Sequence, residues 1–251
     1  IPIRTEEGRE IRKSFIPQKD GWKILSADYS QVELRMMAHF SKDKGLIDAF
    51  NNTEDIHSKT ASLVFNVPVE MILPEMRRTA KVVNFGIMYG AGAFRIGQEL
   101  GISRKEATLL IENYFNQYPG IQNYIDSTCS MAREKKYVET ILGRKRPIWD
   151  ANSDNGLRRQ AAERMAINMP IQGSAAEMIK LAMINIHDEI TKMSLRSKLV
   201  LQIHDELIFE FPNEEEEDLV GLVIDKMENA LELSVPIIVD YGIGNSWYEA
   251  H

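Results

Sequence analysis

The stretch KLVLQIHDELIFEF, residues 198–211, is typical of a β-hairpin and indicates a fold built on an antiparallel sheet. Apolar and β-branched residues alternate with polar ones on both sides of His204, Asp205 and Glu206, as in two strands that meet at a turn. Acidic residues in an apolar hairpin are costly unless a cation neutralises them, and no lysine stands next to these two. The hairpin therefore predicts a metal site at its turn.

The same three residue types, His-Asp-Glu, also occur earlier, at residues 187–189. Around that copy the apolar residues recur at the spacing of one helix face: Met178, Leu181, Ala182, Ile186 and Ile190. We therefore interpret Asp188 and Glu189 as solvated helix residues, and only the copy at Asp205 as a site.

A second candidate metal ligand is Asp28, in the stretch WKILSADYS, residues 22–30. This stretch predicts a strand that enters a turn, so Asp28 would lie at a strand end as Asp205 does. Two such aspartates can hold a pair of divalent ions about 3.5–4 Å apart, an arrangement that stabilises the entering and leaving oxygens in phosphoryl transfer. Oxygen ligands of this kind suit Mg²⁺.

A third element is RRTAKVVNFGIMYG, residues 77–90. Arg77, Lys81, Phe85 and Tyr89 are spaced four apart and share one face of a helix. Two cations followed by two aromatic rings match the order of a triphosphate, a sugar and a base. An ordinary amphipathic helix explains any one of these residues, but a core-facing stripe should not begin with Arg and Lys.

The bulk composition is that of an ordinary globular chain, with 251 residues, 44% hydrophobic and 27% charged. Its net charge of −7 argues weakly against a nucleic-acid partner. Basic residues are nevertheless clustered, which allows a local basic surface: Arg77, Arg78 and Lys81; Arg144, Lys145 and Arg146; Arg158, Arg159 and Arg164. No membrane span or signal peptide is visible, and the single Cys129 excludes an intramolecular disulfide, so we expect a cytoplasmic protein.

The middle of the chain, residues 42–135, is helical in pattern almost throughout. Ser103 and Glu106 form a capping-box signature at the start of one helix, and Pro119 suits the first turn of the next. We therefore expect a long helical insertion here.

The second half of the chain returns to strands. Residues 136–149 predict a hairpin with Gly143 in its turn, and Pro170 is expected to break or kink the helix that follows. Asn213 is expected to cap a helix that begins with four glutamates, and residues 236–244 predict a last strand. Strands at both ends and helices between them indicate an α+β fold.

Three stretches together carry a resemblance: DYSQVELRMMAHFS (28–41), RRTAKVVNFGIMYG (77–90) and QIHDELIFE (202–210). They resemble motifs A, B and C of family A DNA polymerases, the bacterial DNA polymerase I group, in the family's order. The resemblance implies a template-directed DNA polymerase that adds deoxynucleotides to a primer 3′ end by two-metal-ion nucleotidyl transfer.

The resemblance also implies an antiparallel palm sheet with a long helical fingers insertion. The expected division is palm for residues 1–41, fingers for residues 42–157 and palm again for residues 158–251. On this interpretation the chain is a C-terminal fragment with fingers and most of the palm, and the thumb is absent.

By resemblance, the metal ligands are Asp28, Asp205 and the backbone carbonyl of Tyr29, with Glu206 in a supporting role. The implied cofactor is a pair of Mg²⁺ ions, for which Mn²⁺ can substitute. Lys81 is implied as the group that protonates the leaving pyrophosphate.

The incoming deoxynucleotide has a second implied set of contacts. Arg77, Lys81 and His57 contact its phosphates, although His57 alone would be taken for an ordinary surface histidine.

The sugar and the base have their own implied contacts. Phe85 packs on the sugar and base, while Tyr89 and Glu33 leave no room for a 2′-hydroxyl. Gln31 lies nearby.

The stretch RMAINMPIQGSAAEMIK, residues 164–180, also resembles the family. The residues implied to contact primer-template DNA are Arg164, Asn168, Gln172, His204 and Tyr89. The minor groove presents nearly the same acceptors for every correct pair, so donors there can test pairing without reading sequence. The expected partners are primer-template DNA and dNTPs, without a membrane, for a protein that acts as a monomer.

Two other functions remain open from the residues. One is a catalytically silent nucleotide- or DNA-binding module. The other is a metal-dependent phosphohydrolase, which needs the paired acids but not the Arg-Lys-Phe-Tyr face.

Overall fold

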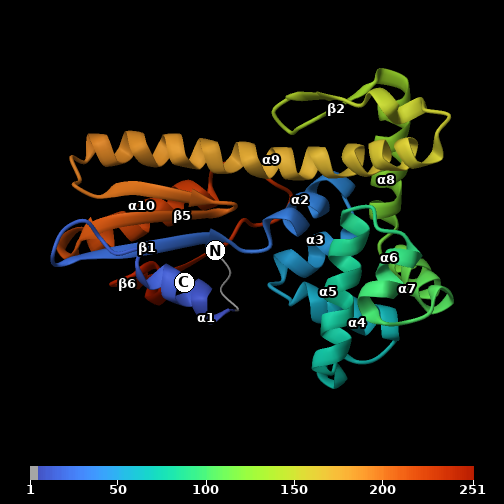
Figure 1. The fold of residues 1–251 in the computed structure, drawn as a ribbon, viewed down its shortest axis with the longest axis horizontal. Helices are drawn as coiled ribbons and strands as arrows, with labels where there is room; N and C mark the ends of the chain where they lie inside the picture. Colours follow the sequence, from blue (N-terminus) through green and yellow to red (C-terminus); the bar gives the residue numbers. More distant parts are fainter. Residues whose placement is uncertain (1–4) are drawn as a thin grey trace. The chain divides into compact units, whose positions relative to one another are not determined.

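The computed structural model describes residues 5–251, and the chain divides into two compact units (Figure 1). The first unit contains residues 5–32, Ala175–Glu232 and Ile237–His251. The second contains Glu33–Ser174 and Leu233–Pro236.

The first unit is built on a four-stranded antiparallel sheet, as predicted. The strands lie in the order β4-β5-β1-β6, and their bounds are Lys198–Ile203, Glu206–Pro212, Trp22–Tyr29 and Val239–Gly244. β1 is central and pairs with β5 on one side and β6 on the other. As expected for a central strand, its residues Ile24, Leu25 and Ala27 are buried.

Helices cover both faces of this sheet. On one face α10 (Glu216–Glu228) packs against β1, β5 and β6, and the Tyr29 hydroxyl donates to the Met227 carbonyl at 2.9 Å. On the other face α11 (Trp247–Ala250) packs against β1, β6 and α1 (Glu6–Lys13). Gly242 makes the close approach of α11 possible, because a Cβ there would lie 2.4 Å from the Ala250 carbonyl oxygen.

The expected cap at Asn213 is wrong. Residues Asn213–Glu215 form a short 3₁₀ turn, and α10 begins at Glu216 without a side-chain cap. Glu215 is buried and accepts hydrogen bonds from the backbone N–H groups of Arg196 and Ser197. This member of the acidic run therefore ties α10 to the chain before β4 and is not a solvated residue.

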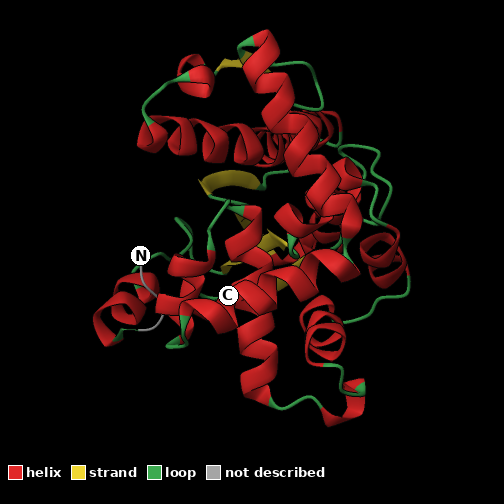
Figure 2. Cartoon of the chain, turned by 90° about the vertical axis from the view of Figure 1, so that its right-hand side faces the viewer, coloured by secondary structure: helices red, strands yellow, loops and turns green. Residues whose placement is uncertain are grey.

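The second unit is mainly helical, as Figure 2 shows for the chain coloured by secondary structure. The capping box of Ser103 and Glu106 is present, and Pro119 is the first residue of its helix, both as predicted. Its helices before residue 136 are α2 (Val32–Ser41), α3 (Lys44–Asn51), α4 (Ile56–Phe65), η1 (Val69–Met71), α5 (Pro74–Met88), α6 (Ala93–Leu100), α7 (Arg104–Gln117) and α8 (Pro119–Lys135).

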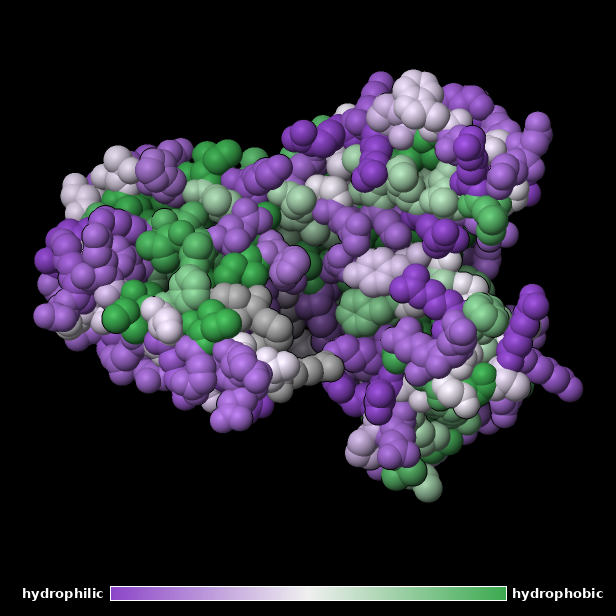
Figure 3. Space-filling model, viewed as in Figure 1, coloured by the Kyte–Doolittle hydropathy of each residue, from purple (hydrophilic) through white to green (hydrophobic). Residues whose placement is uncertain are grey.

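The predicted second hairpin is also present. It consists of β2 (Tyr137–Glu139) and β3 (Lys145–Pro147), with Gly143 at a φ of 80° in the connection. The short 3₁₀ helix η2 (Trp149–Asn152) follows it. The basic residues of β3 are exposed, and much of the surface seen in Figure 3 is hydrophilic.

Of the break or kink expected at Pro170, the break is wrong. α9 runs as one helix from Gly156 to Lys192, through Pro170 and from the second unit into the first. A proline inside a helix removes one hydrogen bond and crowds the preceding turn, at a cost of about 3 kcal/mol. Here the Tyr124 hydroxyl donates to the Ile167 carbonyl at 2.8 Å, and Ala166 and Ile171 are buried, so tertiary contacts surround the helix at this point. None of the helices in residues 5–251 is both long and apolar enough to cross a membrane.

Candidate active site

The first unit brings Asp28 and Asp205 together at one end of its sheet. Asp28 is near the end of β1, and Asp205 is in the turn that connects β4 to β5. The Tyr29 backbone N–H donates to the Asp205 carbonyl at 3.3 Å, which fixes the turn against the strand end. His204 adopts a left-handed φ of 55° in this turn and is exposed.

The electrostatics of this pair fit a cation. Burial, followed by the charges of Asp205, Glu206 and Asp240, raises the pKa of Asp28 to about 7. Burial also raises the pKa of Asp205. The Asp28 Oδ1 atom is buried and has no hydrogen-bond partner. Carboxylates held together in this way are stabilised by a divalent ion, which lowers their pKa values.

The protein side of such a metal site consists of few groups. No set of three or more His, Cys, Asp or Glu side chains within residues 5–251 is arranged to hold a metal. Asp28 and Asp205 remain the candidate side-chain donors, and the family resemblance adds the backbone carbonyl of Tyr29. A site of one or two carboxylates that leaves positions for substrate phosphates is typical of Mg²⁺.

Glu206 has different surroundings from its neighbour Asp205. It is 4% exposed, and its Oε1 accepts from Ser26 Oγ at 2.5 Å and from Trp247 Nε1 at 2.7 Å. His251 Nδ1 lies 3.3 Å from the same oxygen. These contacts join Glu206 to β1 and α11. Glu206 therefore stabilises the position of the strand that carries Asp28.

Sequence reasoning missed Asp240. It lies on β6 directly opposite Asp28, which in turn is opposite Glu206 on β5. Directly paired residues of an antiparallel sheet point to the same face, so three carboxylates share one row. The strand containing Asp240 was predicted, but its register was not, and the register alone creates this row.

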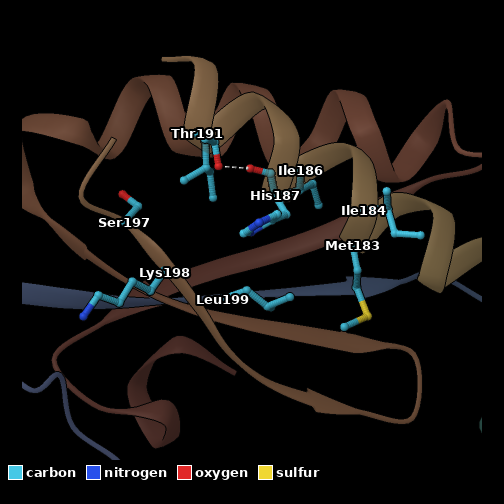
Figure 4. Close-up of a pocket in the computed structure, with 9 residues that line it drawn as sticks. Met183, Ile184, Ile186, His187, Thr191, Ser197, Lys198 and Leu199 are labelled. Carbon is cyan, nitrogen blue, oxygen red and sulfur yellow. Dashed lines mark hydrogen bonds between the residues drawn. The ribbon is translucent and has the colours of Figure 1, made fainter. Parts of the chain in front are cut away.

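The other His-Asp-Glu copy lies on a helix, as predicted. Asp188 is exposed on α9. His187 lines a pocket between α9 and β4 together with apolar residues that include Met183, Ile186 and Leu199 (Figure 4). No carboxylate lines this pocket, so it lacks the chemistry of the Asp28 site.

The second unit places the predicted residues of α5 in one row. The rings of His57 and Phe85 are 5.8 Å apart between centroids, and those of Phe85 and Tyr89 are stacked at 6.3 Å. Lys81 is exposed and forms no ion pair with any described residue. The cations and aromatic rings of this face therefore lie together, as the spacing predicted.

Arg77 has a partner that the sequence did not reveal. Its Nε donates to Asp55 Oδ2 at 2.6 Å. Burial alone would raise the pKa of Asp55, but hydrogen bonds from Arg77, Ser58 and the His57 backbone lower it to about 2. An anionic ligand of Arg77 must therefore compete with Asp55.

His57 is not a surface residue, contrary to the expectation for its local sequence. It is 3% exposed, and burial, together with Arg77 and Lys81, lowers its pKa to about 4 against the opposing charge of Asp55. The Asn84 amide lies 3.1 Å from its Nδ1.

Tyr89 and Glu33, the two residues implied to exclude a 2′-hydroxyl, are hydrogen-bonded to each other. The Tyr89 hydroxyl donates to Glu33 Oε2, and Gln172 Nε2 donates to Glu33 Oε1 at 3.4 Å. Glu33 stands in the first turn of α2, Tyr89 follows α5 and Gln172 lies on α9. Gln31, in the turn before α2, has a left-handed φ of 52° and a buried Oε1 without a hydrogen-bond partner.

The remaining residues implied for DNA binding lie on α9. Arg164 packs so closely on the turn after α5 that a Cβ at Gly90 would be 2.8 Å from its Cγ. The Asn168 Oδ1 atom is buried without a hydrogen-bond partner. Arg164 also lines a polar pocket with Arg104 and Arg133.

An antiparallel sheet with paired carboxylates at its end, joined to a helical unit with a cationic and aromatic helix face, defines a class of nucleotide-polymerising folds. The model of DNA polymerase family A matches residues 1–249, and the chain belongs to this family. The chain is 50% identical over 250 residues to DNA polymerase I of Bacillus caldotenax, and 45% identical over 251 residues to DNA polymerase I of Pseudomonas aeruginosa. All of this chain is covered in both comparisons, but only 28% and 27% of those relatives.

A solved structure shares the whole fold. The polymerase domain of Pol1 from M. smegmatis, in complex with DNA primer-template and dNTP, superposes with a TM-score of 0.95 at 47% identity. The match covers 100% of this chain and 44% of that one. The α+β fold predicted from the sequence, with its antiparallel sheet and helical insertion, is confirmed.

Proposed function

We propose that this chain carries the synthetic centre of a template-directed DNA polymerase, which adds deoxynucleotides to a primer 3′ end. The observation that carries the proposal is the pair Asp28 and Asp205, two adjacent carboxylates with raised pKa values in a chain of DNA polymerase family A. The solved relative in complex with primer-template and dNTP supports the choice of substrates.

Two Mg²⁺ ions, with Mn²⁺ as a substitute, fit the donors Asp28, Asp205 and the Tyr29 carbonyl. When bound, they would activate the primer 3′-hydroxyl and neutralise the charge of the triphosphate. The protein would hold these oxygens in place, and Glu206 would contribute by stabilising the strand that carries Asp28.

The α5 face would bind the incoming nucleotide. Arg77, Lys81 and His57 contact the phosphates, and the exposed ammonium of Lys81 can give its proton to the leaving pyrophosphate. Positioned cations of this kind stabilise the charge that develops during phosphoryl transfer. Phe85 then lies against the sugar and the base.

The hydrogen-bonded pair of Tyr89 and Glu33, with Gln31 nearby, would select deoxynucleotides over ribonucleotides. On the DNA side, Arg164, Asn168, Gln172 and His204 supply hydrogen-bond donors for the minor groove, and Tyr89 completes that surface. Donors of this kind report correct pairing without reading sequence.

The wider assignment follows from the same family. Palm would comprise residues 1–41 and 158–251, fingers residues 42–157, and the protein would act as a monomer in the cytoplasm. The chain spans less than a third of the length of the curated relatives named above, so the activity concerns the whole protein.

Primer extension with Mg²⁺ tests the function, and a dNTP-binding titration run beside it separates the alternatives. Extension by the full-length protein, lost on Asp28→Ala, is the expected result. Nucleotide and DNA binding without extension would indicate a silent binding module. Hydrolysis of phosphate esters without a template would indicate a phosphohydrolase.

A further inference from the structure

Asn84, a buried amide next to His57, has no part in the function proposed above. Asn84 is 0% exposed on α5. Its Nδ2 lies 3.1 Å from His57 Nδ1 and 3.2 Å from Thr60 Oγ1. The Tyr118 hydroxyl lies 3.1 Å from the same Thr60 oxygen. The Thr60 hydroxyl thus holds the amide, and the Tyr118 hydroxyl in turn holds Thr60.

We propose that Asn84 is a positioning residue that fixes His57 in the tautomer with an unprotonated Nδ1 and a proton on Nε2. A neutral imidazole has one N–H and one acceptor nitrogen, and the bond that one nitrogen makes decides the state of the other. An amide N–H that points at Nδ1 therefore places the proton on Nε2. No described residue hydrogen-bonds to Nε2, so this N–H is available to a ligand.

The surroundings of the ring support the neutral form. His57 is buried, and its neighbours Arg77 and Lys81 are cations that oppose a further positive charge. The negative charge of Asp55 favours a protonated ring. Its carboxylate, however, already accepts hydrogen bonds from Arg77, Ser58 and the backbone N–H of His57. A neutral His57 would therefore orient a ligand through one N–H hydrogen bond, while Arg77 and Lys81 would provide the positive charge.

A single N–H in a rigid, buried position suits an anionic oxygen, which in this site is a phosphate oxygen of the incoming nucleotide. This part of the inference rests on the proposed function. The tautomer itself does not, because it follows from contacts within one unit of the protein.

The tautomer can be read directly from the nitrogen resonances of His57 in the 251-residue chain labelled with ¹⁵N-histidine. The chain has five histidines, and the signals lost in a His57→Gln variant identify the ring. We expect Nδ1 to resonate as an unprotonated nitrogen and Nε2 as a protonated one. A protonated Nδ1 in the parent would overturn the proposal.

Two variants test the role of the amide. Asn84→Asp is nearly isosteric and offers only acceptors, so the proton is expected to move to Nδ1. Asn84→Leu removes the donor, and we expect mixed protonation and about tenfold weaker binding of dATP, the worth of one hydrogen bond. Asn113→Leu is the matched control, because Asn113 is a partly buried amide on α7 that donates to the Val64 carbonyl at 3.4 Å, away from the ring. It should leave both the resonances and dATP binding unchanged.

The outcomes separate this inference from the proposed function. A full-length parent protein that binds no dATP, with Nδ1 unprotonated in the chain, would overturn the proposed function and leave the tautomer assignment standing. Nitrogen resonances that stay the same in Asn84→Asp would overturn the assignment, whatever the chain binds. If Asn84→Leu moved the proton but not the affinity for dATP, the link to the phosphate would be wrong.

Discussion

Replacing Glu33 with alanine is expected to let the polymerase accept ribonucleotides. The Glu33 carboxylate is held from two sides, by the Tyr89 hydroxyl on one oxygen and by Gln172 at 3.4 Å on the other. A carboxylate fixed in this way occupies a defined volume, and an alanine leaves that volume open to a 2′-hydroxyl.

The size of the effect follows from the bond that is lost. A hydrogen bond to a charged group contributes about 1.5–3 kcal/mol. Glu33→Ala removes the carboxylate together with both of its hydrogen bonds, and we expect about a ten- to hundredfold fall in discrimination. Tyr89→Phe should give a smaller fall, because the carboxylate remains and keeps its longer contact with Gln172.

The assay is the ratio of kcat/KM for an rNTP to that for the matching dNTP, measured in the full-length protein. Glu112→Ala provides the control, since Glu112 is an exposed acid on α7 in the same unit. A ratio in Glu33→Ala no higher than in the parent would refute the reasoning. If Glu112→Ala raised the ratio by the same amount, the effect would come from the loss of a negative charge alone.

Four further outcomes are expected. Asp28→Ala or Asp205→Ala should abolish primer extension while DNA binding survives, whereas Asp188→Ala on the exposed face of α9 should change extension little; equal damage from all three would contradict the assignment. Lys81→Ala should lower the single-turnover rate at saturating dNTP by about a hundredfold, and an unchanged rate would remove Lys81 from the transition state. Phe85→Tyr should favour dideoxynucleotides by about tenfold or more in competition with dNTPs, because a hydroxyl there can replace the missing 3′-hydroxyl bond; equal selectivity would mean that Phe85 does not face the sugar. The pKa of Asp28 is raised from 3.8 to about 7 by burial and by neighbouring carboxylates, so its contribution to stability is lost as pH rises through that range, and Asp28→Asn should raise the Tm of the metal-free chain above pH 7.

Local patterns predicted the parts of the fold that depend on neighbours in sequence. The alternation around Asp205 and the strand before Asp28 placed both carboxylates at strand ends, and the structure brings them together. Ser103 and Glu106 form the capping box that their spacing indicated. The strand ends and the capping box are decided by contacts within a few residues, whereas the meeting of the two carboxylates depends on strand pairing.

Features that depend on distant contacts could not be predicted. Pro170 lies inside a helix whose neighbouring turn is held by a distant residue, since the Tyr124 hydroxyl binds the Ile167 carbonyl across 43 residues of sequence. Asp240 joins the carboxylate row only through the register of β6 on β1. The burial of His57 likewise follows from helix packing, which a single local stretch does not encode.

The central position of β1 has a consequence for the synthesis of the chain. Ser26 on β1 bonds to Glu206 on β5 across 180 residues of sequence, and β6 is made later still. At about 5–20 residues per second on the ribosome, roughly 10–40 s separate these strands. Meanwhile residues 33–174 provide nearly all of the helical unit, which can complete its core first. The sheet that carries Asp28 and Asp205 can then form only after the helical unit, and the apolar β1 is open to wrong pairing until β5 leaves the ribosome.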